Sequence, residues 1–346
     1  PAGYNASWQG DYSELNIYDA QFPEDVQIFW TGNSVCAPVS QDTLTNFKTH
    51  RLEEGKDSRR SPLFWLNWPV NDINMKRLMM GKGSLLHTNI NIEDLAGVVT
   101  NPMQDAEPSK VSLFAIADYA WNVKGFDDDK SWEDSFKYID SDASEALHTI
   151  AKHTSDPAPN GHGLVLEESE EIKPLLDEFK TKLSSGESLI EVGTKLVNEM
   201  NIIIEASDEF INTSNNARMV EQITPFANSL KDLATSIKDY VNAAMNLEEK
   251  DNESAIQNFA DGTVAYENSK NHDRPTINGS TKAQPGSKRL VPFAEAVRDG
   301  ISNKINALVN GGENLVITPS TNISNIYSGN IENIVDGKAD TFIWNG

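Results

Sequence analysis

The chain has 346 residues, carries a formal net charge of −23 and is too long for one compact core, so two or more domains are expected. The acidic surface repels phosphate backbones and argues against nucleic acid as a partner. No apolar run reaches the roughly 20 residues that span a bilayer, and residues 1–4 lack the basic and apolar parts of a signal peptide. The single cysteine, Cys36, excludes an internal disulfide framework and is expected to be a small buried side chain.

Residues 1–153 alternate strand-like and helical runs. Apolar, β-rich runs predict strands at Val26–Trp30, Leu63–Trp68 and Leu95–Thr100. Helical patterns occupy the segments between and after them, at 42–52, 75–80, 109–121 and 132–153. This alternation is typical of βα units that build a parallel sheet.

Each predicted strand stops abruptly in polar or aromatic residues. The first runs into Thr31-Gly32-Asn33, the second into Asn67-Trp68-Pro69 and on to Asp72, and the third into Asn101-Pro102. Parallel α/β folds bind their ligands at the carboxyl ends of the strands. Amide, carboxylate and aromatic groups in that place predict a site for a neutral, hydroxyl-rich ligand such as a sugar.

Residues 154–311 are predicted to form an all-α helical bundle. Apolar residues recur at steps of three and four from Ile223 to Ala244, which marks one buried face of a long helix. Similar stripes on either side predict several antiparallel helices, with breaks at 184–186, 213–216 and 271–288. We expect no strand and no cofactor site in this zone. Residues 312–346 are short β-rich runs between Asn, Ser and Gly, which indicates the truncated start of a β-sandwich.

An ordered set of motifs resembles one enzyme family. Tyr4, residues 28–32, 65–72 and 100–102, and Ala117-Asp118-Tyr119-Ala120-Trp121-Asn122 together are similar to family 84 of the glycoside hydrolases, the bacterial β-N-acetylglucosaminidases related to clostridial hyaluronidase and to O-GlcNAcase. The resemblance implies that residues 1–153 are the C-terminal half of a TIM (β/α)₈ barrel. The family carries a helical bundle after its barrel, which accounts for 154–311. Residues 312–346 resemble the start of a discoidin-like carbohydrate-binding module.

The resemblance also implies an activity. The family releases terminal β-linked N-acetylglucosamine from glycans or glycoproteins by substrate-assisted retaining catalysis, in which the 2-acetamido oxygen attacks the anomeric carbon and forms an oxazoline. Its catalytic pair of adjacent aspartates belongs to an earlier strand and is not found in this chain. We therefore expect no catalytic residue in this chain and no activity of the fragment by itself. No metal or cofactor is expected either. The resemblance further implies a secreted or cell-surface protein.

The residues present are those that would bind the sugar. By resemblance, Asp72 accepts hydrogen bonds from sugar hydroxyls and Asn101 contacts them as donor and acceptor. Asn67 holds the catalytic constellation or the leaving-group side. Tyr4 donates its hydroxyl near the oxazoline oxygen, and Trp65 forms a flat wall for the acetamido methyl group.

Structural roles are the alternatives for these residues. Asp72 equally suits the N-cap of a helix that begins near Ile73, Asn101 before Pro102 is a common turn pair, and Trp65 suits the barrel core.

Other chemistry-bearing residues are interpreted as structural. The adjacent acids Asp127–Asp129 fit the N-cap of a helix better than a catalytic pair, and they lack the rest of a calcium loop. His148 and His153 are spaced poorly for one metal ion. Packing roles are expected for Trp30, Trp68, Tyr119 and Trp121.

Two other functions remain open from the sequence. One is a glycan-binding or adhesion protein without catalysis, in which the pocket survives and the aspartate pair is absent. The other is a periplasmic-type sugar-binding protein, which the long helical zone disfavours. The natural substrate, whether hyaluronan, mucin O-glycan or O-GlcNAc on protein, is not determined by these residues.

Overall fold

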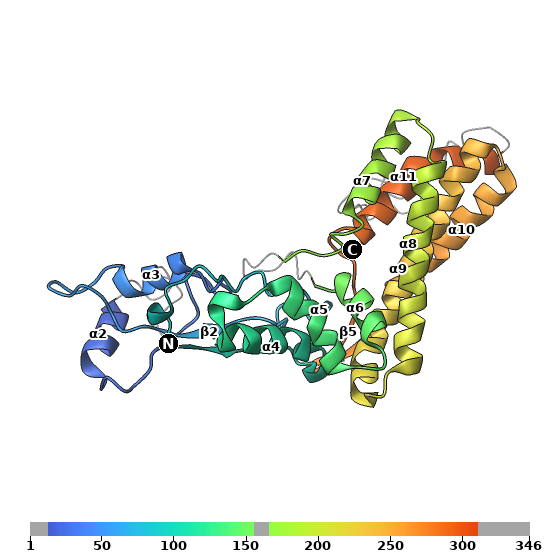
Figure 1. Ribbon diagram of the computed structural model, residues 1–346. Helices are drawn as coiled ribbons and strands as arrows, with labels where there is room; N and C mark the ends of the chain where they lie inside the picture. Colours follow the sequence, from blue (N-terminus) through green and yellow to red (C-terminus); the bar gives the residue numbers. More distant parts are fainter. Residues whose placement is uncertain (1–12, 156–165, 311–346) are drawn as a thin grey trace, which may run out of the picture. The chain divides into compact units, whose positions relative to one another are not determined.

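The computed structural model describes residues 13–155 and 166–310 of the chain (Figure 1). The described residues up to 298 belong to one compact unit and residues 299–310 belong to a second. Tyr4 and the β-rich segment predicted at 312–346 lie outside the described residues. The boundaries expected after residues 153 and 311 stay predictions.

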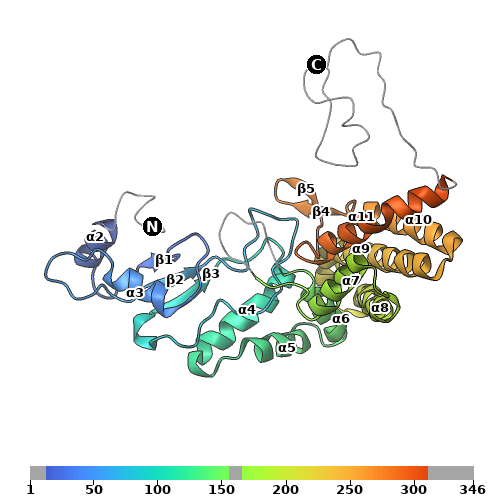
Figure 2. The same ribbon diagram turned by 90° about the horizontal axis from the view of Figure 1, so that it is seen from above.

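A parallel sheet of three strands, in the order β1-β2-β3, lies in the first of the two described ranges (Figure 2). The strands are β1 (Phe29–Trp30), β2 (Leu63–Leu66) and β3 (Gly97–Thr100). All three form where the sequence predicts them, although each is shorter. The α/β class of this zone is confirmed, and the carboxyl ends of the strands meet at one edge.

The two faces of the sheet differ in burial. Trp30, Phe64 and Leu66 are at most 2% exposed, and the Trp30 ring lies 5.0 Å from that of Phe47 on α3. On the opposite face Trp65 is 40% exposed. The alternation of a strand places neighbouring side chains on opposite faces, so Trp65 is not part of this core. The alternative of a barrel-core role for Trp65 stays a prediction, because the opposite face of the sheet is the one that the rest of a barrel would cover.

Helices and 3₁₀ turns (η) complete this zone. Ser40 begins α3 by accepting the backbone N–H of Thr43, as an N-cap does. The elements other than strands are α2 (Ser13–Gln21), α3 (Gln41–Thr49), η1 (Ile92–Asp94), α4 (Ala106–Trp121), η2 (Val123–Gly125), α5 (Asp128–Ile139) and α6 (Ser144–Lys152).

Two helix predictions in this zone are wrong. Residues 75–80 form an irregular loop, because the buried Asn71 amide donates to the Arg77 carbonyl at 2.6 Å and Met79 and Met80 are buried without helical pairing. The single helix predicted over 132–153 is two helices. Asp140 ends α5 and its carboxylate accepts the N–H of Ala143, which turns the chain into α6.

The aromatic residues interpreted as packing residues divide into two groups. Trp30, Trp68 and Tyr119 are buried, and the Tyr119 hydroxyl donates to the His87 carbonyl at 2.8 Å. Cys36 is buried as well. Trp121 is 90% exposed because it is the last residue of α4, so its expected packing role is wrong.

Long helices form most of the second zone. In α9, a helix of 33 residues, the predicted apolar stripe is buried along its whole length. α9 packs against α8 and α10 (Figure 1), and α8 also contacts α6 and α7. The helices are α7 (Lys173–Ser185), α8 (Ile190–Thr213), α9 (Ala217–Glu249), α10 (Asn252–Ser269) and α11 (Leu290–Val309). No helix of the described residues is both long enough and apolar enough to cross a membrane.

The break predicted at 271–288 contains a β-hairpin, so the expectation of no strand in this zone is wrong. Its strands, β4 (Asp273–Thr276) and β5 (Gly279–Lys282), are antiparallel. Each has four mainly polar residues, so neither carries the apolar alternation by which strands are recognised.

Candidate functional site

Asn67 is the centre of a hydrogen-bonded cluster at the carboxyl ends of β2 and β3. It directly follows β2, is 8% exposed, and its Nδ2 donates to the Val35 carbonyl at 2.6 Å. Its Oδ1 accepts two bonds, from Trp65 Nε1 at 2.9 Å and from Asn101 Nδ2 at 3.1 Å. One amide therefore sets the positions of the other two side chains.

Trp65 presents a half-exposed indole beside this amide. Its ring meets that of Phe29 edge to face, with the centroids 6.0 Å apart. Because its N–H is bound to Asn67, the indole has a fixed orientation while part of its apolar surface is open. A flat ring held in this way is suited to contact an apolar group of a ligand.

Asn101 is fixed at both its backbone and its side chain. Its backbone N–H donates to the Leu66 carbonyl at 3.0 Å, which continues the pairing of β2 and β3 by one residue. An amide offers two donors and two acceptor lone pairs, so Asn101 keeps capacity for a ligand after its bond to Asn67.

Asp72 is exposed in the loop that follows β2. Asn71 closes this loop by its bond to the Arg77 carbonyl, and no described helix begins beside Asp72, so the alternative of a helix cap is wrong. Burial raises the pKa of the nearby Cys36 thiol to about 12, with a further contribution from the charge of Asp72. Asp72 is thus close to the loop that holds Asn67.

The loop after β1 contains contacts that the sequence did not indicate. The Cys36 thiol donates to the Asn67 carbonyl at 3.1 Å, and the carbonyl of Val35 holds the Asn67 side chain. In both contacts the acceptor is a backbone carbonyl, that of Asn67 for the thiol and that of Val35 for the amide. Residue types carry no signal of either, so they could be found only in the folded chain.

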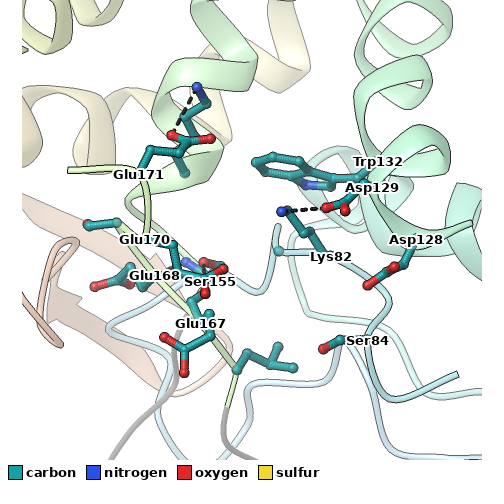
Figure 3. A pocket seen from close by; sticks show the side chains of 14 residues that line it. Lys82, Ser84, Asp128, Asp129, Trp132, Ser155, Glu167, Glu168, Glu170 and Glu171 are labelled. Carbon is teal, nitrogen blue, oxygen red and sulfur yellow. Dashed lines mark hydrogen bonds and ion pairs between the residues drawn. The ribbon is translucent and has the colours of Figure 1, made fainter. Parts of the chain in front are cut away.

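The acidic run at the start of α5 has the structural role expected of it. Asp127 accepts the N–H of Lys130 at 3.0 Å as the N-cap of α5. Its oxygens and those of Asp128 and Asp129 lie within 4.8 Å of one another, and Lys82 forms an ion pair with Asp129 at 2.5 Å (Figure 3). Burial disfavours the charge of Lys82, but the bond to Asp129 and the negative charges of Asp129, Glu170 and Asp128 together raise the pKa of Lys82.

Lys82 and Asp129 line a cavity of about 340 Å³ together with Trp132 and Glu171 (Figure 3). The Lys82 ammonium lies 5.6 Å from the centre of the Trp132 ring, and Lys152 pairs with Glu171 at 3.0 Å. None of the predicted sugar-site residues lines this cavity. The acidic groups named here thus have lysine or helix N-terminal partners.

The two histidines have separate surroundings. His148 stacks on Phe136 with the ring centres 4.7 Å apart, whereas Nδ1 of His153 forms a hydrogen bond with the Ser169 hydroxyl at 2.8 Å. Burial lowers the pKa of His148 to about 4 and that of His153 to about 3. Both rings are neutral at pH 7 and act in packing.

The burial of His153 predicts a loss of stability in mild acid. The folded protein keeps His153 neutral, while the unfolded chain binds a proton below its ordinary pKa of 6.5. The free energy of unfolding should therefore fall as the pH drops from 6.5, by up to ~1.4 kcal/mol per pH unit. In urea titrations between pH 7.5 and 5, the parent chain should lose ~2 kcal/mol more than His153→Gln.

The exposed His50 supplies the control for this pH dependence. His50→Gln should keep the pH dependence of the parent chain. Equal slopes for the parent and His153→Gln would show that His153 is not the group responsible.

Comparisons with known proteins point to the β-N-acetylglucosaminidases. Residues 1–152 match the family model described as β-N-acetylglucosaminidase. Protein O-GlcNAcase from Rattus norvegicus is 32% identical over 112 residues, which are 32% of this chain and 11% of that protein, and the Mus musculus protein gives the same values.

Solved structures extend the similarity beyond the matched segment. The structure of CpGH84D has a TM-score of 0.81 and 43% sequence identity, and covers 87% of this chain and 49% of its own. An O-GlcNAc hydrolase from Thermobaculum terrenum has a TM-score of 0.68 at 17% identity over 87% of this chain and 60% of its own, which shows a shared fold. This chain spans about half of CpGH84D and about a tenth of the O-GlcNAcases. Residues 1–152 are thus similar to the β-N-acetylglucosaminidase family, and the chain as a whole is similar in fold to CpGH84D.

Proposed function

We propose that this chain is the sugar-binding part of a β-N-acetylglucosaminidase that removes terminal β-linked N-acetylglucosamine from glycans or glycoproteins. The observation that carries the proposal is the Asn67 amide, which joins Trp65 and Asn101 at the ends of β2 and β3. An amide offers both donors and acceptors, so Asn101, held in place by Asn67, is suited to pair with the hydroxyl groups of a sugar.

The side chains have separate roles in the proposed complex. Asp72 and Asn101 bind the ring hydroxyls, and the exposed surface of Trp65 contacts the acetamido methyl group. Asn67 acts mainly on the other two groups, since its Oδ1 already accepts a bond from each of Trp65 and Asn101. Tyr4, outside the described residues, is proposed to donate to the acetamido oxygen.

The proposed reaction is substrate-assisted. The acetamido oxygen attacks the anomeric carbon as the leaving oxygen departs, and water then opens the oxazoline. This chain contributes by holding the acetamido group folded beneath the ring, which makes an intramolecular attack efficient. The two aspartates that polarise the acetamido nitrogen and protonate the leaving oxygen would lie in residues upstream of this chain.

The sheet supports this arrangement. Phe29, Trp65 and Val99 are all more than a third exposed on one face of β1 to β3. In the proposed half-barrel this face points to the barrel interior and would be covered by earlier strands.

We further propose that the complete protein is secreted or located at the cell surface.

Hydrolysis of 4-nitrophenyl N-acetyl-β-D-glucosaminide tests the proposal. A protein extended upstream to a complete barrel should release nitrophenol, while this chain by itself should not. Release by this chain would place a catalytic carboxylate within it. No release from a folded extended protein that still binds N-acetylglucosamine would favour a glycan-binding protein without catalysis.

A further inference from the structure

The β4–β5 hairpin and the segment after it contact both loops that carry residues predicted to bind the sugar. The loop after β3 carries Asn101, and three residues later Gln104 accepts the N–H of Ile277 at 2.7 Å and donates to the Pro275 carbonyl at 3.3 Å. The loop after β2 carries Asp72, and four residues later the Lys76 carbonyl accepts the N–H of Gln284 at 2.8 Å.

Arg274 of β4 forms an ion pair with Asp105, the residue after Gln104. Both side chains are buried, with relative exposures of 1% for Arg274 and 5% for Asp105. Asp105 stands at the N-cap of α4, yet its side chain makes no capping bond. An aspartate in that position ordinarily caps its own helix, so its carboxylate has been diverted to a residue 169 positions away.

The guanidinium group of Arg274 is otherwise poorly satisfied. Its Nε and Nη1 have no hydrogen-bond partner, and burial lowers the pKa of Arg274 to about 10. It packs over the ring of Phe226 at 5.5 Å. Burying a charged group in this way is costly, and the contact with Asp105 is the strong interaction that offsets the cost.

The hairpin has a firm base on α9. His272, just before β4, bonds to Asp232 at 2.7 Å. The Ser229 hydroxyl donates to the carbonyls of Ser269 and Ala283, at 2.6 and 3.3 Å. The three residues of α9 that hold it, Phe226, Ser229 and Asp232, are spaced three apart and share one face of the helix.

We propose that Arg274 is a positioning residue for sugar recognition. Through Asp105 it fixes the loop that presents Asn101, so the hairpin of the helical zone sets the geometry of the sugar pocket. This inference rests on the proposed function for its catalytic consequence. The structural step, from Arg274 to the Asn101 loop, does not depend on it.

Amide hydrogen exchange of this chain tests the structural step. Asn101 donates its N–H to Leu66, so its exchange rate reports how firmly the loop is held. Arg274→Met should accelerate that exchange about tenfold and leave the amides of α8 and α10 unchanged. Arg274→Lys, which keeps the charge, should restore most of the protection.

Arg289→Met is the matched control. Arg289 also forms an ion pair, with Glu167 at 2.6 Å, but no contact of it reaches either strand-end loop. It should leave the exchange of Asn101 within about twofold of the parent chain. An acceleration spread evenly over all amides in Arg274→Met, or an equal effect of Arg289→Met, would overturn the proposal.

Asp105→Asn gives a second check. It removes the same ion pair from the other side, so it should reproduce the effect of Arg274→Met, and the double variant should add little to either. Additive effects of the two substitutions would mean that the residues act independently.

Kinetics of the extended enzyme test the catalytic consequence. Arg274→Met should raise KM for the nitrophenyl substrate about tenfold with a smaller change in kcat, because a displaced Asn101 weakens binding in both the ground and transition states. Unchanged KM would overturn the proposed effect on recognition. If the extended parent protein is inactive, the proposed function fails, while the exchange experiment still decides the role of Arg274.

Discussion

Asp72→Asn, in the protein extended to a complete barrel, should lower kcat/KM for the nitrophenyl substrate by on the order of 100-fold. Asp72 is exposed in the loop that follows β2, where its carboxylate can accept hydrogen bonds from ring hydroxyls. Hydrogen bonds to a charged acceptor are about twice as strong as neutral ones, and an asparagine of the same size presents an N–H in place of one oxygen. The loss of kcat/KM should therefore come from the missing charged acceptor and not from a change in side-chain size.

The fold should tolerate this change. Asp72 caps no helix, and it lies in a loop that Asn71 and Arg77 close without it. The melting temperature of Asp72→Asn should stay within a few degrees of the parent. Asp118→Asn, at an exposed position on α4, is the matched control and should retain full activity. An active Asp72→Asn enzyme would remove Asp72 from the sugar site.

Phe64→Ala should lower the free energy of unfolding much more than Trp65→Ala does, although the two residues are adjacent. Phe64 is fully buried beside Trp30, with the ring centres 6.3 Å apart, so its removal should cost ~3–5 kcal/mol of unfolding free energy. Trp65 is 40% exposed on the other face and should cost much less. Urea unfolding of this chain measures both values.

The catalytic activity of the extended protein should instead be reduced more by Trp65→Ala than by Phe64→Ala. Trp65→Ala removes the proposed wall for the acetamido group and should weaken catalysis strongly, whereas any Phe64→Ala protein that stays folded should keep its pocket. If Trp65→Ala destabilises as much as Phe64→Ala, then Trp65 is a core residue, and the proposed wall is wrong.

Local patterns predicted much of the fold. The three strands could be recognised because apolar, β-rich runs end abruptly in Gly, Asn and Pro. The long helix α9 could be recognised because its stripe repeats with the period of a helix. The segment 75–80 could not, because its apolar residues suit burial in either a helix or a loop, and the Asn71 bond to the Arg77 carbonyl decided between them.

The candidate site was predicted to the same depth. The sequence placed Asn67 at the end of a predicted strand and Asp72 and Asn101 after predicted strands, and the resemblance supplied their roles. The indole of Trp65 was ambiguous, because a strand residue points to one face or the other and the pattern around Phe64 and Trp65 is apolar on both.

By itself, the sequence determined the strands of the parallel sheet, the helical zone after it and the polar residues at the strand ends, because periodicity and strand punctuation act between near neighbours. Only the tertiary structure decided that Asn67 binds both Trp65 and Asn101, and that Arg274 reaches Asp105 across 169 positions. Such contacts depend on how distant segments pack. A lone arginine in a short polar strand carries no mark of the aspartate that it will meet.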